Sequence, residues 1–472
     1  MRTSSGLGRG LVLAAVVGLG AGCSSGSGGG GGPDSGTTAC GSANGTVVTH
    51  TANITASESW AGDGVTHSVP NGIAINAPAT VTVQPCAIVA LGQNASITIN
   101  GGATLLAAGT SATRYVSFVR ADDTKPWGIL RVTTSGTNAM GLLDLHWTAI
   151  QGGGAFGGQY HNPAIAAAGP GYSSLPGAMV RVDNVVIDSP QGVGVYFDGN
   201  AAFTSDSQNL AIQNAPNYVF EMTMMSVGSI PAGNYTQGNA APYAMVDVGP
   251  NANVFGDMTI TKNIPVVINS GGVVVRGPTN TTAPVTLTVQ AGAQLYFNGT
   301  RVIFGGNGNP PNNPVGVLLA LGTAAEPILF SSALQSPAPG DWVGLWLDTA
   351  NGSQLDHVII EYAGGASGIV SANCRPVTTP NTPDNAALIV GDFDGYPSGS
   401  DSQYVPPANL ITNSVIRYSA GFGIDAVWAT AAGFDTPDLT SGNTFTSNAG
   451  CAQTYNGWVG HPCPTGGGCT AQ

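Results

Sequence analysis

The sequence is poor in charged residues, and lysine is almost absent. Only 8% of the 472 residues are charged, and the lysines are Lys125 and Lys262. After residue 22, no stretch carries a sustained apolar stripe at helical spacing, so we expect few helices. No apolar run there reaches the ~18 residues that a membrane-spanning helix needs. These absences argue against a helical protein.

Basic residues are also outnumbered by acidic ones. The sequence has 12 Lys and Arg against 25 Asp and Glu, which gives a formal net charge of −13. An acidic surface repels nucleic acid and anionic lipid. We therefore expect no nucleic-acid partner.

The sequence is rich in glycine and in short runs of β-branched residues. The chain has 70 glycines, and runs rich in Val, Ile and Thr recur roughly every ten residues, as strands joined by tight turns would. Examples are residues 81–83, 97–99, 116–119 and 129–132. Most of these runs alternate apolar and polar residues, which predicts strands with one buried face.

Motifs in the first half of the sequence return in the same order in the second half. Val81-Thr-Val returns as Leu287-Thr-Val, and Trp127-Gly returns as Trp342-Val-Gly. A long series repeated in order indicates a duplicated structural unit. The two halves that we expect are residues 45–236 and 237–472.

The spacing of these strands predicts how they pair. The runs show neither the two-residue Asn-Gly spacing of hairpins nor the helical crossovers of α/β proteins. Parallel strands without helices can form when the chain coils and stacks each strand on the previous one. We therefore predict an all-β protein, a right-handed parallel β-helix (a solenoid) with two tandem halves.

Several segments resemble a known family. Gly102-Ala-Thr-Leu-Leu, Trp127-Gly-Ile and Pro327-Ile-Leu-Phe look like the rungs of bacterial surface lipoproteins with pectin-lyase-like β-helix repeats. The resemblance covers about residues 45–450. It implies the same right-handed parallel β-helix, and it implies no activity, because one fold hosts many functions.

The N-terminus has the features of an export signal. Arg2 and Arg9 precede a short apolar segment, residues 11–19, that is too short to span a bilayer. We expect residues 1–22 to be a lipoprotein signal peptide that is removed. A polar Gly/Ser-rich stretch follows, and we expect residues 23–44 to be a flexible tether.

The residues around Cys23 suggest a membrane anchor. Leu19-Gly-Ala-Gly-Cys23 resembles the lipobox of bacterial lipoproteins, in which the cysteine is acylated and becomes the first residue. The resemblance implies that Cys23 carries the lipid and that the protein sits at the outer membrane or cell surface. The alternative is an ordinary signal peptide cut near Ala21, with Cys23 as a spare thiol.

Six further cysteines remain after Cys23. An even number in an exported protein predicts disulfides. Cys40 and Cys86 are alone in the first half, and we expect them to pair with each other. The remaining cysteines leave their pairing open: Cys374, Cys451, Cys463 and Cys469.

Aromatic residues are the main candidates for ligand binding. An aromatic ring on the outer face of a strand can stack on a sugar ring. The residues that we expect to bind a ligand, a polysaccharide or cell-surface glycan, are Trp346, Tyr362, Tyr396 and Tyr404.

The densest cluster of acidic residues lies in a glycine-rich segment. Asp392, Asp394 and Asp401 could supply the oxygen ligands that Ca²⁺ prefers, although their spacing departs from an EF-hand loop. The alternative is an Asp/Gly turn loop without a metal. No other cofactor is indicated.

These features favour a non-catalytic, acyl-anchored surface protein that takes part in adhesion or glycan binding. Pectate lyases and polygalacturonases have the same fold, but their catalytic motifs are missing here, so we expect no catalytic residues. The first alternative is a polysaccharide lyase or glycoside hydrolase with a site around residues 384–404. The second is a structural envelope protein with no ligand.

Overall fold

A computed structural model describes most of the chain between residues 39 and 456. The described ranges are 39–135, 139–155, 161–171, 177–247, 253–269, 271–276, 284–304, 316–347, 352–368, 373–374, 385–391, 405–426 and 437–456. Nearly all regular structure in these ranges is β-strand, and the only helix among them is α1 (Met224–Val227). The protein is all-β, as predicted.

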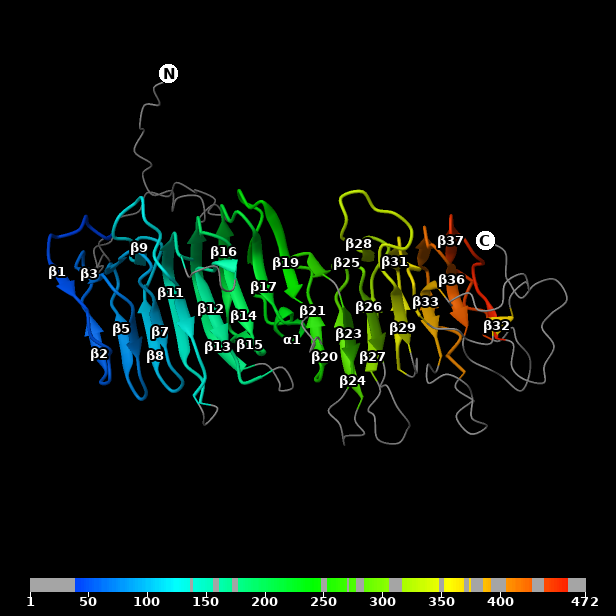
Figure 1. Cartoon of the computed structure of the whole chain (residues 1–472), viewed down its shortest axis with the longest axis horizontal. Helices are drawn as coiled ribbons and strands as arrows, with labels where there is room; N and C mark the ends of the chain where they lie inside the picture. The colour runs from blue at the N-terminus through cyan, green and yellow to red at the C-terminus, as the bar shows by residue number, and fades with distance from the viewer. Residues whose placement is uncertain are drawn as a thin grey trace, which may run out of the picture.

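A sheet of 13 strands, the long sheet, runs from one end of the molecule to the other (Figure 1). Its pairings are parallel. In spatial order its strands are β4 (Ile73–Ile75), β7 (Ile97–Ile99), β10 (Leu130–Val132), β12 (Ile165–Ala168), β14 (Val195–Asp198), β17 (Tyr218–Met222), β19 (Ala241–Asp247), β22 (Val266–Asn269), β25 (Gln294–Asn298), β28 (Ile328–Ser332), β31 (Val358–Glu361), β35 (Val415–Arg417) and β37 (Thr444–Thr446).

A second sheet, the N-terminal sheet, has 12 strands in two arms. One arm contains β1 (Val47–Thr49), β3 (Thr66–Val69), β6 (Ile88–Leu91), β9 (Val116–Arg120), β16 (Gln208–Gln213) and β18 (Gly233–Asn234). The other contains β2 (Glu58–Trp60), β5 (Thr80–Val83), β8 (Thr104–Ala108) and β15 (Ala201–Phe203). The strands β11 (Leu142–Gln151) and β13 (Gly177–Asp188) belong to both arms.

The two long strands turn a corner between these arms. Trp147 in β11 and Asn184 in β13 have φ angles of 40° and 59°, in the left-handed region. Residues before Trp147 pair with β8, and residues after it pair with β9. A single left-handed residue thus redirects each strand from one face of the molecule to the next.

The C-terminal part has two further parallel sheets. The six-stranded sheet contains β20 (Asn253–Val254), β23 (Gly272–Val275), β26 (Arg301–Phe304), β29 (Gly344–Leu347), β33 (Ala386–Val390) and β36 (Phe422–Ala426). The five-stranded sheet contains β21 (Met258–Ile260), β24 (Val285–Val289), β27 (Gly316–Leu321), β30 (Gln354–Asp356) and β34 (Ile411–Thr412). The strands β32 (Asn373–Cys374) and β38 (Tyr455–Asn456) form a small antiparallel pair.

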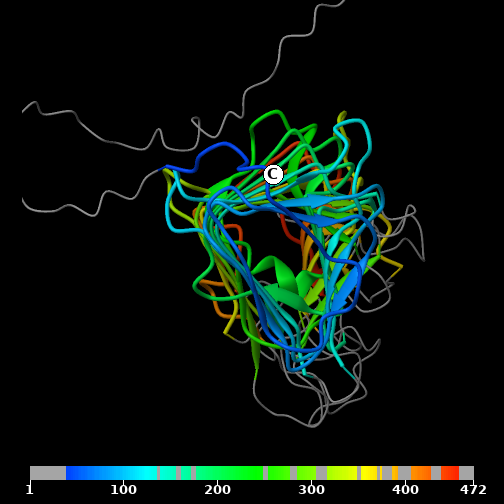
Figure 2. The ribbon, with the colours of Figure 1, turned by 90° about the vertical axis from the view of Figure 1, so that its left-hand side faces the viewer.

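The chain visits the sheets in a fixed rotation. In the C-terminal part it passes from the long sheet through the six-stranded to the five-stranded sheet, and then returns to the long sheet. On its return each strand lies beside the strand of the previous circuit, as β25 lies beside β22. The circuits stack along the long axis in Figure 1, and Figure 2 shows the sheets end-on around a common centre.

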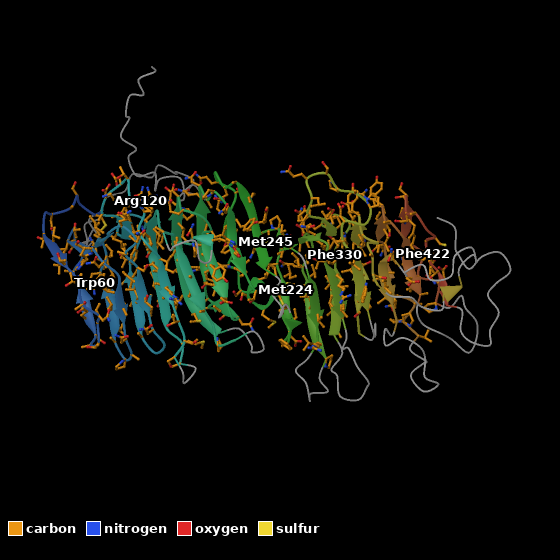
Figure 3. All side chains as sticks on the ribbon, viewed as in Figure 1. Trp60, Arg120, Met224, Met245, Phe330 and Phe422 are labelled. Atoms are coloured by element: carbon orange, nitrogen blue, oxygen red, sulfur yellow. A yellow bond between two sulfur atoms is a disulfide. The ribbon has the colours of Figure 1, made fainter. Side chains whose placement is uncertain are left out.

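The core lies inside these circuits. Alternate residues of strands such as β5 and β8 are buried, because neighbouring side chains on a strand point to opposite faces. The largest fully buried side chains include Trp60, Trp127 and Trp342. Buried aliphatic and aromatic side chains form one core cluster from Ile54 to Ala452, and Figure 3 shows side chains along the whole rod, with Trp60 near one end and Phe422 near the other.

The N-terminal and C-terminal parts of the rod meet at a junction, residues 223–247 and 253–260. There the N-terminal sheet ends at β15 and β18, and the other two sheets begin at β20 and β21. The long sheet alone continues through it, from β17 through β19 to β22. The helix α1 is fully buried and lies inside the ring of strands in the end-on view (Figure 2). The described parts therefore form one continuous rod along the long sheet.

One disulfide lies at the N-terminal end. The Sγ atoms of Cys40 and Cys86 are 2.09 Å apart, the pairing that the sequence predicts. Cys451 is also disulfide-bonded. Cys463 and Cys469 lie outside the described residues. Within the described ranges, no helix is long and apolar enough to cross a membrane.

Candidate functional site

The structure describes two of the four aromatic residues predicted to bind a ligand. Tyr362 and Trp346 lie in described ranges, whereas Tyr396 and Tyr404 lie outside them. The predicted calcium ligands and the predicted acylation site also lie outside the described residues: Asp392, Asp394, Asp401 and Cys23.

Tyr362 forms a stacked pair with Tyr418. Tyr362 follows β31 and Tyr418 follows β35, at the same corner of successive circuits. Both residues have a left-handed backbone conformation, with φ angles of 60° and 57°. Because parallel strands lie roughly 4.8 Å apart, a repeated corner brings the two rings face to face, with centroids 5.1 Å apart and planes 13° apart. Both side chains are half-buried.

An ion pair holds the guanidinium group of an arginine next to these rings. Glu361 and Arg417 are cross-strand partners in β31 and β35. The Arg417 Nη2 and Nε atoms lie 2.6 Å and 2.8 Å from Glu361 Oε2, and Ser331 Oγ donates to Glu361 Oε1 at 2.8 Å. The Arg417 Cζ atom lies 5.5 Å from the centroid of the Tyr418 ring, within cation–π range. The carboxylate thus fixes the guanidinium beside the aromatic pair.

Tyr296 continues this row one circuit earlier. It is the cross-strand partner of Ser331, and its hydroxyl donates to Gln294 Oε1 at 3.1 Å. Burial, together with the negative charge of Glu361, raises the pKa of Tyr296. We call Tyr296, Ser331, Glu361, Tyr362, Arg417 and Tyr418 the tyrosine strip. Its aromatic faces and fixed donors are the groups that recognise the C–H faces and hydroxyls of sugars.

Trp346 lies on a different sheet and is only 4% exposed. It packs with Ile303, Ala386 and Ile389 in a small cluster of its own, separate from the main core. The Arg301 guanidinium lies 5.1 Å from the centroid of its ring. The structure therefore does not bring Trp346 together with Tyr362, and a sugar could stack on Trp346 only if covering groups moved.

Sequence reasoning missed a second polar site, which we call the charged corner. It lies beside the bends in β11 and β13 and consists of Asp144, His146, Arg181, Asp183 and Asp206. Register places Asp144 beside Arg181 and His146 beside Asp183. His146 Nε2 lies 3.0 Å from Asp144 Oδ1, and His146 Nδ1 lies 3.5 Å from Asp183 Oδ2. An imidazole thus lies between two carboxylates.

Arg181 links this imidazole to a third carboxylate. Its Nη1 atom contacts both His146 Nε2 and Asp144 Oδ1, and its Nε atom donates to Asp206 Oδ2 at 2.7 Å. Burial alone would lower the pKa of Arg181, but the hydrogen bond to Asp206 and the charge of Asp144 raise it overall. Hydrogen bonds from Thr204 and Arg181 lower the pKa of Asp206.

The sequence contained one weak signal for the charged corner. In a chain with so few charged residues, Asp144 and His146 alternate with buried leucines, and Arg181 and Asp183 flank a buried valine. That alternation predicts four outward side chains. Their contact across 37 residues depends on the length of the intervening circuit, which the pattern does not give.

Two histidines form a separate stack at the N-terminal end. His50 and His67 both stack on Trp60, with centroid distances of 4.1 Å and 5.1 Å. His67 Nε2 lies 3.0 Å from Ala61 O and must carry the proton, so His67 Nδ1 accepts from His50 Nε2 at 3.0 Å. Burial lowers the pKa of both histidines, and in His50 the nearby His67 adds to this effect.

Metal ligands do not gather in the described part of the chain. No group of three or more His, Cys, Asp and Glu side chains there is arranged to hold a metal ion. In the charged corner, the Arg181 guanidinium contacts the Asp144 and Asp206 carboxylates that a cation would need.

Comparison with known proteins does not add to this geometry. No protein family, no curated protein and no solved structure matches the chain. The evidence for function is therefore the chemistry of the sites themselves.

Proposed function

We propose that this chain is an acyl-anchored cell-surface protein that binds glycans without cleaving them, and that the tyrosine strip is the binding surface. One observation carries the proposal. The stacked rings of Tyr362 and Tyr418 lie next to an arginine that Glu361 holds in place. A ring surface with an adjacent fixed donor is suited to a sugar, which offers an apolar face and a hydroxyl edge.

The proposed scaffold is a right-handed parallel β-helix with two tandem halves, residues 45–236 and 237–472. The rotation of the chain through three faces and the parallel pairing of successive circuits support the solenoid. Equivalent tryptophans support the tandem halves. Trp127 Nε1 donates to Gln151 O and Trp342 Nε1 donates to Glu361 O, both at 2.9 Å.

The proposed anchor is an acylated Cys23, which would display the rod at the outer membrane or cell surface. It is supported by the Leu19-Gly-Ala-Gly-Cys23 sequence and the Gly/Ser-rich tether that follows. Labelling of cells with a radioactive or clickable fatty acid tests it. Label should enter the wild-type chain and be lost in Cys23→Ser, and equal labelling of both would contradict the anchor.

A panel of soluble polysaccharides tests the binding function. We suggest a neutral β-glucan, a galactomannan, chitosan and pectin, each scored for retention of the full chain and for cleavage. The proposal predicts retention on at least one of them, with loss of retention in Tyr418→Ala. A matched control is Tyr218→Ala, because Tyr218 is also half-buried and pairs with another tyrosine, Tyr243, away from the strip. Retention on none of them would favour a structural envelope protein.

Cleavage of a polysaccharide is the second candidate function, and the charged corner favours it. An imidazole between two carboxylates on an outer face can act in general acid–base chemistry. If this candidate is right, the same panel will release new chain ends, and Asp183→Asn and His146→Gln will abolish the release while Tyr218→Ala keeps it. If the wild-type protein releases no new polysaccharide ends, cleavage is ruled out and binding remains as the function.

A further inference from the structure

A cleft of about 910 Å³ lies at the junction of the rod. We call it the junction cleft. Its lining residues come from β13, the end of β15, the segment after α1, β21 and β24: Ala178, Ala202, Phe203, Thr204, Ser205, Ser207, Met225, Gly228, Ser229, Ile230, Pro231, Asp257, Met258, Thr259, Thr286 and Thr288. Small-molecule sites in proteins commonly have volumes of roughly 300–1,000 Å³.

The cleft exists because the stacking of strands is interrupted here. The helix α1 lies against β15 and β20, where the other circuits have a strand. Among the described strands, β21 pairs with β24 alone, and β15 pairs with β13 alone. Side chains that the next circuit would cover elsewhere in the rod therefore line the cleft.

Hydroxyl groups and apolar patches make up most of the lining. Seven of the described lining residues are serine or threonine, and Phe203, Met225 and Met258 supply apolar surface. Thr259 of β21 and Thr288 of β24 are cross-strand partners on the outward rows of these strands. A wall that alternates hydroxyls with apolar surface matches a sugar, which has hydroxyl edges and C–H faces.

The charge of the cleft sets which ligands it can accept. Among the described residues that line the cleft, Asp257 alone is charged and none is basic. The Asp257 Oδ1 atom accepts a hydrogen bond from the Thr286 backbone N–H at 2.8 Å, which fixes this carboxylate in the lining. Asp206, at the edge, is already paired with Arg181 and adds no net negative charge. A carboxylated or sulfated ligand would meet the like charge of Asp257 there.

We propose that the junction cleft is a second binding site, separate from the tyrosine strip, and that it holds a short neutral oligosaccharide and rejects anionic ones. This inference rests on the volume, the hydroxyl groups of the lining and the carboxylate of Asp257 together. The site does not depend on glycan binding at the tyrosine strip, since the two share no residue.

Calorimetric titration of the full chain with trisaccharides tests the proposal. The neutral probes are trimers of glucose, galactose, mannose and N-acetylglucosamine, and the anionic probe is a trimer of galacturonic acid. We expect at least one neutral trimer to bind and the anionic trimer not to bind. Ser205→Trp, which fills the cleft from an exposed lining position, should weaken binding at least tenfold, and Thr288→Val should weaken it about threefold.

Two controls separate the cleft from the fold and from the tyrosine strip. Thr82→Val makes the same change as Thr288→Val on a half-buried outward position of β5, and it should leave binding unchanged. The same titrations in the Tyr418→Ala background, which lacks one ring of the tyrosine strip, measure binding at the cleft. Asp257→Asn keeps the acceptor for the Thr286 N–H but removes the charge, so the anionic trimer should now bind. The proposal is overturned if no neutral trimer binds, if Ser205→Trp binds as tightly as the wild type while its melting temperature is unchanged, or if the wild type binds the anionic trimer equally well.

Discussion

The rings of Tyr362 and Tyr418 lie 5.1 Å apart and almost parallel because both residues occupy the same left-handed corner of successive circuits. The residue at the next such corner is Ser447, with a φ angle of 57°. The aromatic surface therefore ends at Tyr418, where the Arg417 guanidinium lies beside it. The repeat of the same corner in successive circuits positions the pair, and the tyrosines at these two corners supply the rings of the proposed binding surface.

The disulfide between Cys40 and Cys86 is expected to stabilise the N-terminal end. It closes a separation of 46 residues, and the loss of chain entropy in the unfolded state corresponds to about 4 kcal/mol for a loop of this length. Cys40→Ala/Cys86→Ala should therefore lower the free energy of unfolding by up to that amount. Urea unfolding measures the change. A double variant that unfolds at the wild-type midpoint would show that the bond does not constrain this end.

The histidine stack is expected to make the same end sensitive to acid. The folded-state pKa of His50 and His67 lies below the ordinary value of 6.5. At a pH between the folded-state pKa and 6.5, the unfolded chain therefore binds more protons than the folded chain. Stability is then complete above pH 6.5 and is lost as the pH falls below it. The groups facing the imidazoles are Glu58, Trp60 and the Ala61 carbonyl.

Hydrogen exchange measured peptide by peptide can follow this acid sensitivity. After correction for the intrinsic effect of pH, residues 46–69 should lose protection between pH 7.5 and pH 5.5, while the circuits near Trp342 should not. His50→Phe keeps a ring against Trp60 but removes one titrating group, so its loss of protection should be smaller. An equal loss in both proteins would mean that His50 does not cause it.

The two buried tryptophans are expected to behave alike when substituted. Trp127→Phe and Trp342→Phe each remove a hydrogen bond from the indole N–H to a backbone carbonyl, and each leaves a space in the core because both indoles are fully buried. The lost hydrogen bond and the lost packing together cost about 1–3 kcal/mol, and each variant should lose about that much stability in urea unfolding. Trp147→Phe, at a half-buried corner, is the matched control and should cost less. A loss in only one of the two core variants would contradict their structural equivalence.

Arg181 is expected to control the titration of Asp206. Hydrogen bonds from Thr204 and Arg181 lower the pKa of this carboxyl below 3.8, so Arg181→Gln should raise it toward that value. Carboxyl-detected NMR measures the shift. Lys262→Gln, which breaks the exposed pair with Glu326, is the control and should leave Asp206 unaffected. An unchanged pKa in Arg181→Gln would show that Thr204 alone sets it.

Much of the fold follows from the sequence pattern because strand and turn chemistry are local. The run at residues 97–99 coincides with β7, and the runs at 81–83, 116–119 and 129–132 match β5, β9 and β10 within one residue. The pattern missed the lengths of β11 and β13, which continue through a corner. It predicted few helices but gave no position for α1, since four residues are too few to show helical periodicity.

The relation between the repeated motifs was not predictable. Trp127 precedes β10 in the long sheet, whereas Trp342 precedes β29 in the six-stranded sheet. The matching motifs therefore lie on different sheets of the rod, which the sequence repeat alone does not show. Likewise, Tyr362 was found from its residue type, but its partner Tyr418 and the neighbouring Arg417 follow only from the register of β31 and β35.

The dissociation constant of the full chain for the polysaccharide that retains it is the most direct measure of glycan binding by the tyrosine strip. Loss of one stacking ring corresponds to roughly 1.4 kcal/mol, or about tenfold in affinity. Tyr362→Ala and Tyr418→Ala should each weaken binding by about that factor, while Tyr218→Ala keeps the wild-type value. Wild-type affinity in both strip variants, with their melting temperatures intact, would contradict the proposed function.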